Sequence, residues 1–154
     1  VIMDLFGNVP FRQVDEGPEI NPSVLSRTDA LNFIVTDLEA AITALPTVTG
    51  GSGATNATGS KASARFLLAR VLLNKHIYNG SGTPDSADMT RVISLVDEIE
   101  AEGYALQAGY FDIFRDSPDT ETIWWLETSV GNRIINGLHY RVRWRRLEWL
   151  QYTF

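Results

Sequence analysis

The strongest constraint on the fold is the segment 60–78, SKASARFLLARVLLNKHIY, which is predicted to form one helix with almost no polar side. One apolar stripe has the spacing of a core-facing helix and contains Ala64, Leu67, Leu68, Val71 and Leu72. A second stripe on a neighbouring face contains Ala62, Phe66, Ala69, Leu73 and Ile77. Such a helix needs other helices on more than one side. We expect Ser60 to be its N-cap and Gly80 to end it.

Two further helices are predicted to provide that cover. The first follows the capping-box pattern at Ser26 to Asp29 and ends at Pro46. Its predicted inward residues are Leu31, Ile34, Val35, Leu38, Ala41, Ile42 and Leu45. The second spans about 88–102, and its predicted inward residues are Met89, Val92, Ile93, Val96 and Ile99. The segment 47–59 contains four glycines and is predicted to be the loop before the central helix. Helices joined in this way predict an all-α fold of antiparallel hairpins.

The flanking segments are predicted to be less regular. Residues 1–25 hold three of the six prolines, so we expect no long element there. A short helical turn at about 108–115 is expected to place Tyr110, Phe111, Ile113 and Phe114 against the core. Residues 122–126 are predicted to be a short extended segment. The tail after Tyr140 fits both a strand and a helix, and its periodicity does not decide between them.

Composition limits the classes of function. A length of 154 residues suits one domain, and a net charge of −6 argues against a nucleic-acid partner. The charge is uneven, because four of the 13 basic residues fall within 141–146. The absence of cysteine excludes disulfides and thiol chemistry. No stretch approaches the roughly 18 apolar residues of a membrane span.

No motif predicts catalysis, a metal site or a cofactor. His76 and His139 are the only histidines and stand too far apart in sequence for a local zinc motif; we expect His76 to be structural. The glycine-rich loop lacks the order of a phosphate-binding loop. The acids Asp97, Glu98, Glu100 and Glu102 are most simply the solvated face of the third helix. Glycosylation sequons occur at Asn56 and Asn79.

Aromatic residues near the C-terminus are better candidates for ligand contact. The rings of sugars present apolar C–H faces that stack on aromatic side chains, while their hydroxyl groups need amide or charged partners. The candidates that combine both kinds of group are Trp124, Trp125, Asn132, Arg133, His139 and Tyr140, with Asn136 and Trp144 nearby. In an extended segment Trp124 and Trp125 point to opposite faces, so one of them is expected to lie in the core.

Taken in order, these segments resemble the SusD/RagB family of Bacteroidetes outer-membrane lipoproteins. The matching stretches run from Phe6 to Leu126: FGNVPF at 6–11, Arg27 with DLEAAI and LP at 37–46, KASA and LLARVLLN at 61–74, VI at 92–93, GYAL at 103–106, Tyr110 with Ile113 and Phe114, and ETIW at 121–124. The pair His139 and Tyr140 is similar to the stretch that follows in the family. Each motif alone is weak, and the specific signal is their order and spacing.

The resemblance implies a mostly helical scaffold of tetratricopeptide-like antiparallel hairpins with long loops. Residues 1–140 would be a partial SusD-like domain, and 141–154 an atypical basic and aromatic tail that departs from the family pattern. No strict 34-residue repeat is visible in the sequence. The resemblance also implies an interior portion of a longer protein, with the signal peptide and lipidated cysteine upstream of Val1.

The function implied by the resemblance is non-catalytic. A SusD-like protein would bind an oligosaccharide or polysaccharide on the cell-surface side of the outer membrane and hand it to a SusC-like TonB-dependent transporter. Its membrane attachment would be a lipid anchor outside this segment. The alternative hypothesis is a helical-repeat module that binds another protein or a peptide and has no carbohydrate role.

Overall fold

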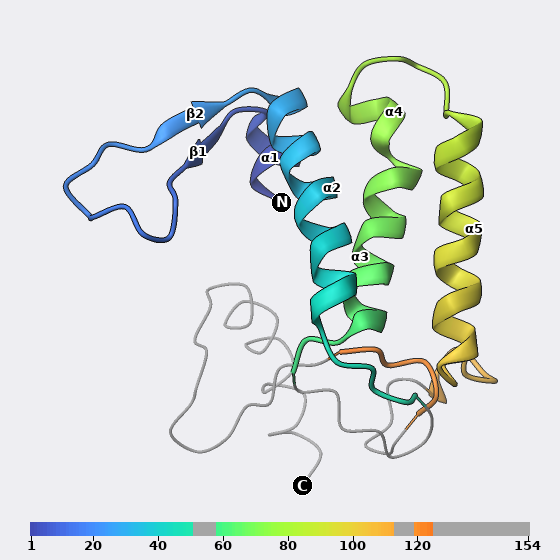
Figure 1. Cartoon of the computed structure of the whole chain (residues 1–154). Coiled ribbons are helices and arrows are strands. Elements are labelled where there is room, and N and C mark those ends of the chain that lie inside the picture. Colours follow the sequence, from blue (N-terminus) through green and yellow to red (C-terminus); the bar gives the residue numbers. More distant parts are fainter. Residues whose placement is uncertain (51–57, 113–118, 125–154) are drawn as a thin grey trace, which may run out of the picture.

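The computed structural model describes residues 1–50, 58–112 and 119–124, and this part of the chain is mostly helical. Its elements are α1 (Ile2–Phe6), β1 (Val9–Phe11), β2 (Ser23–Leu25), α2 (Arg27–Ala44), α3 (Lys61–Leu73), α4 (Lys75–Tyr78) and α5 (Ser86–Ala101). Helices α2, α3 and α5 lie side by side, with α3 in the middle and antiparallel to both neighbours (Figure 1). The predicted helical fold is therefore confirmed, with a small two-stranded sheet in addition.

Helix α2 begins and ends where the sequence predicts. The Ser26 hydroxyl accepts a hydrogen bond from the Asp29 backbone N–H (3.2 Å) and donates one to the Asp29 carboxylate (2.6 Å). The helix ends at Ala44, two residues before Pro46. Its buried side chains are Ala30, Leu31 and Leu38, and the last of these packs in the core between α2 and α3.

The N-terminus of α3 is fixed by a complete capping box. Ser60 is fully buried, and its hydroxyl accepts from the Ser63 N–H (3.3 Å) while the Ser63 hydroxyl accepts from the Ser60 N–H (2.9 Å). Behind this cap, the main core cluster joins α3 to both neighbours and consists of Leu38 from α2, Leu68, Ala69 and Leu72 from α3, and Leu95 from α5.

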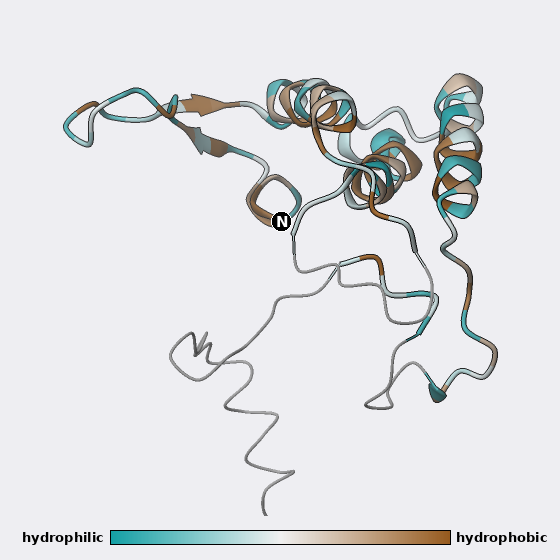
Figure 2. Cartoon of the chain, turned by 60° about the horizontal axis from the view of Figure 1, so that its bottom comes forward, coloured by the Kyte–Doolittle hydropathy of each residue, from teal (hydrophilic) through white to brown (hydrophobic). Residues whose placement is uncertain are grey.

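The structure corrects two expectations about the central helix. It is not continuous to Tyr78, because Asn74 leaves the helical geometry (φ −104°, ψ 5°) and its side-chain amide donates to the Arg70 carbonyl (2.8 Å). Nor are both apolar stripes covered, since Phe66, Leu67, Leu73 and Ile77 are exposed. The reason is that α2 and α5 take two sides of α3, and no other described element covers the third (Figure 2).

Helix α5 buries only part of the predicted stripe, and Leu95 in addition: Ile99 is buried and Val92 packs against the core. Its N-cap is Asp85, whose carboxylate accepts from the N–H groups of Ala87 (2.7 Å) and Asp88 (3.3 Å). Leu95 is fully buried and Ile99 nearly so, whereas Ile93 and Val96 are 62% and 51% exposed. The prediction that Ile93 and Val96 face inward is wrong, because α5 packs mainly against α3 and its buried face is narrow.

A short β-hairpin, which was not predicted from the sequence, precedes α2. Strands β1 and β2 pair antiparallel, with Val9 opposite Leu25 and Phe11 opposite Ser23. Val9 packs on the cluster of Met3, Ala30 and Leu31, so α1 and the hairpin are attached to the first turn of α2. Figure 1 shows the tip of the hairpin projecting away from the helices.

Residues 110 and 111 turn their aromatic side chains outward, whereas Tyr104, closer to the end of α5, is buried. Tyr110 and Phe111 are exposed and pack on each other edge to face, with ring centroids 5.2 Å apart. The prediction that they lie in the core is therefore wrong, and Ile113 and Phe114 lie outside the described residues. Throughout the described ranges, no helix has both the length and the apolarity needed to span a bilayer.

Candidate functional site

Trp124 is exposed at the end of the bundle where α5 finishes. Its side chain is 53% exposed, and the segment 119–124 that carries it crosses this end of the helices (Figure 1). Of the six predicted ligand-binding residues, Trp124 is the one that the structure describes. The others lie outside the described residues, namely Trp125, Asn132, Arg133, His139 and Tyr140. Their grouping around Trp124 stays a prediction.

A tight turn at Asp119 starts this segment. One carboxylate oxygen of Asp119 accepts from the backbone N–H groups of Glu121 (2.8 Å) and Thr122 (2.6 Å), and the other accepts from the Thr122 hydroxyl (2.7 Å). The Thr122 hydroxyl bond, supported by the two backbone bonds, lowers the pKa of Asp119 below 3.8 despite an opposing contribution from burial. The ionised carboxylate therefore holds the turn at neutral pH.

The segment is also tied to the chain that leaves α5. The Thr120 carbonyl accepts from the Ala105 N–H (3.0 Å), and the Glu121 carboxylate accepts from the Gln107 N–H (3.0 Å). In return, the Gln107 side-chain carbonyl accepts from the backbone N–H (3.4 Å) and hydroxyl (3.3 Å) of Thr120. These bonds fix the position of residues 119–121 relative to 105–107.

The residue before Trp124 anchors the segment to the core. Ile123 packs against the buried cluster of Ala62, Ile99 and Tyr104. The Tyr104 hydroxyl donates to the Val48 carbonyl (3.2 Å), and its ring lies so close to Gly50 that a Cβ there would be 2.6 Å away. Trp124 is thus held at the surface by an inward neighbour that contacts both α3 and α5.

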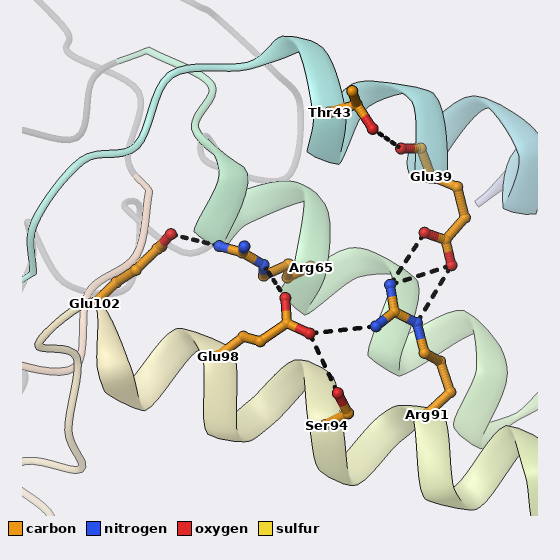
Figure 3. A network of polar contacts seen from close by, with 7 residues as sticks. All are labelled: Glu39, Thr43, Arg65, Arg91, Ser94, Glu98 and Glu102. Atoms are coloured by element: carbon orange, nitrogen blue, oxygen red, sulfur yellow. Dashed lines mark hydrogen bonds and ion pairs between the residues drawn. The ribbon is translucent and has the colours of Figure 1, made fainter.

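A network of charged side chains connects α2, α3 and α5 and is shown in Figure 3. Arg65 on α3 pairs with Glu98 (2.7 Å) and with Glu102. Arg91 on α5 pairs with Glu39 on α2 (3.0 Å) and with Glu98 (3.3 Å). The hydrogen bond to Glu39 is the main reason that the pKa of Arg91 is raised above its usual value.

This network corrects the prediction that the acids of the third helix form a solvated face. Asp97 and Glu100 are exposed as expected, but Glu98 and Glu102 face Arg65, and the Glu102 side chain is only 11% exposed. The signal that could have revealed this is that the charged residues of α3, namely Lys61, Arg65 and Arg70, are all basic, so that a neighbouring helix has to supply their acidic partners. The alternating opposite charges join the three helices, which indicates a structural role for these residues.

The remaining predicted residues do not assemble a reactive site in the described part of the chain. His76 is half-buried on α4, and its Nδ1 atom has no hydrogen-bond partner among the residues described. Within the same ranges, no three His, Asp or Glu side chains are grouped so that they could hold a metal ion. No family model matches the sequence, and no curated protein matches it. The arrangement of Trp124 is therefore the feature on which a function can be argued.

Proposed function

We propose that this chain is part of a non-catalytic, SusD-like glycan-binding protein that passes oligosaccharides to a SusC-like TonB-dependent transporter. The proposal is supported by the ordered motifs between Phe6 and Leu126 and by one structural observation. That observation is a half-exposed tryptophan, Trp124, on a segment held by Asp119, Gln107 and Ile123.

The physical argument is pre-organisation. An aromatic ring on a fixed backbone loses little conformational entropy when a sugar ring stacks on it, so more of the contact energy contributes to affinity. Gln107 and Glu121 on the adjoining backbone carry amide and carboxylate groups of the kind that hydroxyl groups require. This combination of a fixed aromatic ring with amide and carboxylate groups suits capture of a carbohydrate.

We extend the proposal to the architecture and the cellular location. The exposed apolar residues Phe66, Leu73 and Ile77 suit a tetratricopeptide-like scaffold, because a helical hairpin in a stacked array buries its remaining apolar face against the next hairpin. By the same resemblance, the protein would be attached by a lipid to the outer face of the outer membrane.

Affinity electrophoresis of the chain against a panel of polysaccharides tests the function. The proposal predicts that at least one neutral polysaccharide retards the protein, and that the same glycan is recovered without shortened products. Release of shorter oligosaccharides would contradict the non-catalytic role. If no glycan in a broad panel retards the protein, the carbohydrate proposal loses its support.

The second candidate is a protein-interaction module, and the observation that favours it is the same exposed stripe on α3 and α4. Charged substitutions at Leu73 and Ile77 would then abolish binding to a protein partner and leave glycan retardation unchanged. The two candidates therefore predict losses at different surfaces, which single substitutions can separate.

A further inference from the structure

The turn after α4 carries a reactive dipeptide that the proposed function does not use. Asn79 is the C-cap of α4, and its backbone N–H donates to the Lys75 carbonyl (2.9 Å). Gly80 follows with φ +73°, a conformation that glycine adopts without strain. Asn79, Gly80 and Ser81 are all exposed, so water reaches both the side-chain amide and the next peptide bond.

The local hydrogen bonds fold the Asn79 side chain over that peptide bond. The Ser81 backbone N–H donates to the Asn79 side-chain carbonyl (3.0 Å), which closes a ring around the Gly80 peptide group and polarises the carbonyl. Among the described residues, none accepts a hydrogen bond from the Gly80 N–H. Apart from Asn79 and Ser81, no heavy atom of the described residues lies within 4 Å of the place where a Cβ of residue 80 would be, so this side of the turn is open.

We infer that Asn79 is a site of spontaneous deamidation. The deprotonated Gly80 nitrogen attacks Cγ of Asn79, a C–N bond forms, and the side-chain nitrogen leaves as ammonia, which gives a five-membered succinimide. Water then opens the ring at one of its two carbonyl groups and yields aspartate or isoaspartate. The overall reaction consumes one water molecule and releases one molecule of ammonia, and it needs no oxidant, reductant or enzyme.

The product changes the end of α4. A carboxylate at the C-terminus of a helix lies beside the unpaired carbonyl groups, where negative charge is unfavourable. Isoaspartate also adds a carbon to the backbone at the C-cap. Because the neighbouring Lys75 pairs with Asp88 of α5 (2.8 Å), the change occurs next to the ion pair that joins α4 to α5.

Asn74 provides a control within the same chain. Its side-chain nitrogen donates to the Arg70 carbonyl (2.8 Å), and the following residue is Lys75, whose side chain hinders attack. We therefore expect Asn74 to keep its amide under conditions that convert Asn79.

The test is incubation of the full chain at 37 °C at pH 8 and at pH 5, followed by peptide mapping and labelling with protein isoaspartyl methyltransferase. A synthetic peptide of residues 77–83 sets the time course. We expect loss of the Asn79 amide at pH 8 by the time the peptide is converted, slower loss at pH 5, and no methyl acceptance at residue 79 in Asn79→Gln. An intact Asn79 amide in the folded chain after the peptide is fully converted would overturn the inference. Conversion confined to the other Asn-Gly pair, Asn136 and Gly137, would overturn it as well.

Discussion

Arg91 on α5 contacts Glu39 on α2 with Nη2 3.0 Å from Oε2, although these two helices lie on different sides of α3. The same guanidinium also contacts Glu98 (3.3 Å), which in turn pairs with Arg65 (2.7 Å). A continuous network of alternating charges therefore links α2, α3 and α5. The apolar core beneath this network joins α2 and α5 to α3.

The Arg91–Glu39 pair is predicted to give a small, salt-dependent contribution to stability. Both side chains are more than one-third exposed, so we expect a coupling of about 0.2–1 kcal/mol. A double-mutant cycle with Arg91→Gln and Glu39→Gln in urea unfolding measures it, with the exposed Arg12→Gln as the control. A coupling that persists unchanged in 1 M NaCl would contradict the pairing seen here.

Leu95 and Ile93 test which face of α5 is buried. Leu95→Ala removes a fully buried side chain and is expected to lower the free energy of unfolding by about 2–5 kcal/mol. Ile93→Ala removes a side chain that is 62% exposed, and we expect a change within about 0.5 kcal/mol. If the two variants lost similar stability, the packing of α5 on α3 described above would be incorrect.

Gly50 and Gly59 both lie between α2 and α3 in the sequence but differ in their surroundings. A Cβ at Gly50 would lie 2.6 Å from the Tyr104 ring, so Gly50→Ala is expected to cost about 1–3 kcal/mol through overpacking. No atom of the described residues lies within 4 Å of a Cβ at Gly59, so Gly59→Ala is the matched control with little or no cost. Thermal unfolding of the two variants distinguishes them, and equal melting temperatures would refute the Tyr104 contact.

The Asp119 turn is predicted to weaken in acid. Because hydrogen bonds lower the pKa of this carboxyl below its unfolded value of 3.8, its stabilising contribution is complete above pH 3.8 and is lost as the pH falls through the lower folded pKa. NMR titration of the carboxyl carbon measures this pKa directly. Thr122→Val removes the hydroxyl bond, so the pKa should rise toward 3.8; an unchanged value would show that the hydroxyl is not the main cause.

The helices could be predicted because their start and stop signals are local. Ser26, Ser60 and Pro46 act on the backbone within a few residues, and the observed helices begin and end beside them. The interruption of the central helix at Asn74 had no such local signal, because it depends on a hydrogen bond from the Asn74 side chain to the Arg70 carbonyl. The short hairpin was also missed, since pairing of Val9 with Leu25 depends on a contact between distant residues.

Side-chain exposure was harder to predict than helix position. The periodicity of residues 88–102 predicted Ile93 on the inward face and left Leu95 out, because only the placement of α3 decides which of the two is buried. For the same reason, the pairing of Glu98 and Glu102 with Arg65 could not be derived from charge spacing along one helix. At the candidate site, the sequence indicated Trp124, whereas the Asp119 and Gln107 contacts that hold its segment came from the structure.

The most direct test of the central claim is the affinity of Trp124→Ala for the glycan that retards the parent chain. Loss of the stacking ring is expected to weaken binding by about 1.5 kcal/mol, or roughly tenfold. Phe6→Ala is the matched control, because Phe6 is an exposed aromatic residue on α1, away from the end of the bundle where Trp124 lies (Figure 1). Tenfold weaker binding in Trp124→Ala and unchanged binding in Phe6→Ala is the predicted result. Equal affinities of Trp124→Ala and the parent chain would contradict the assignment of Trp124 as the glycan platform.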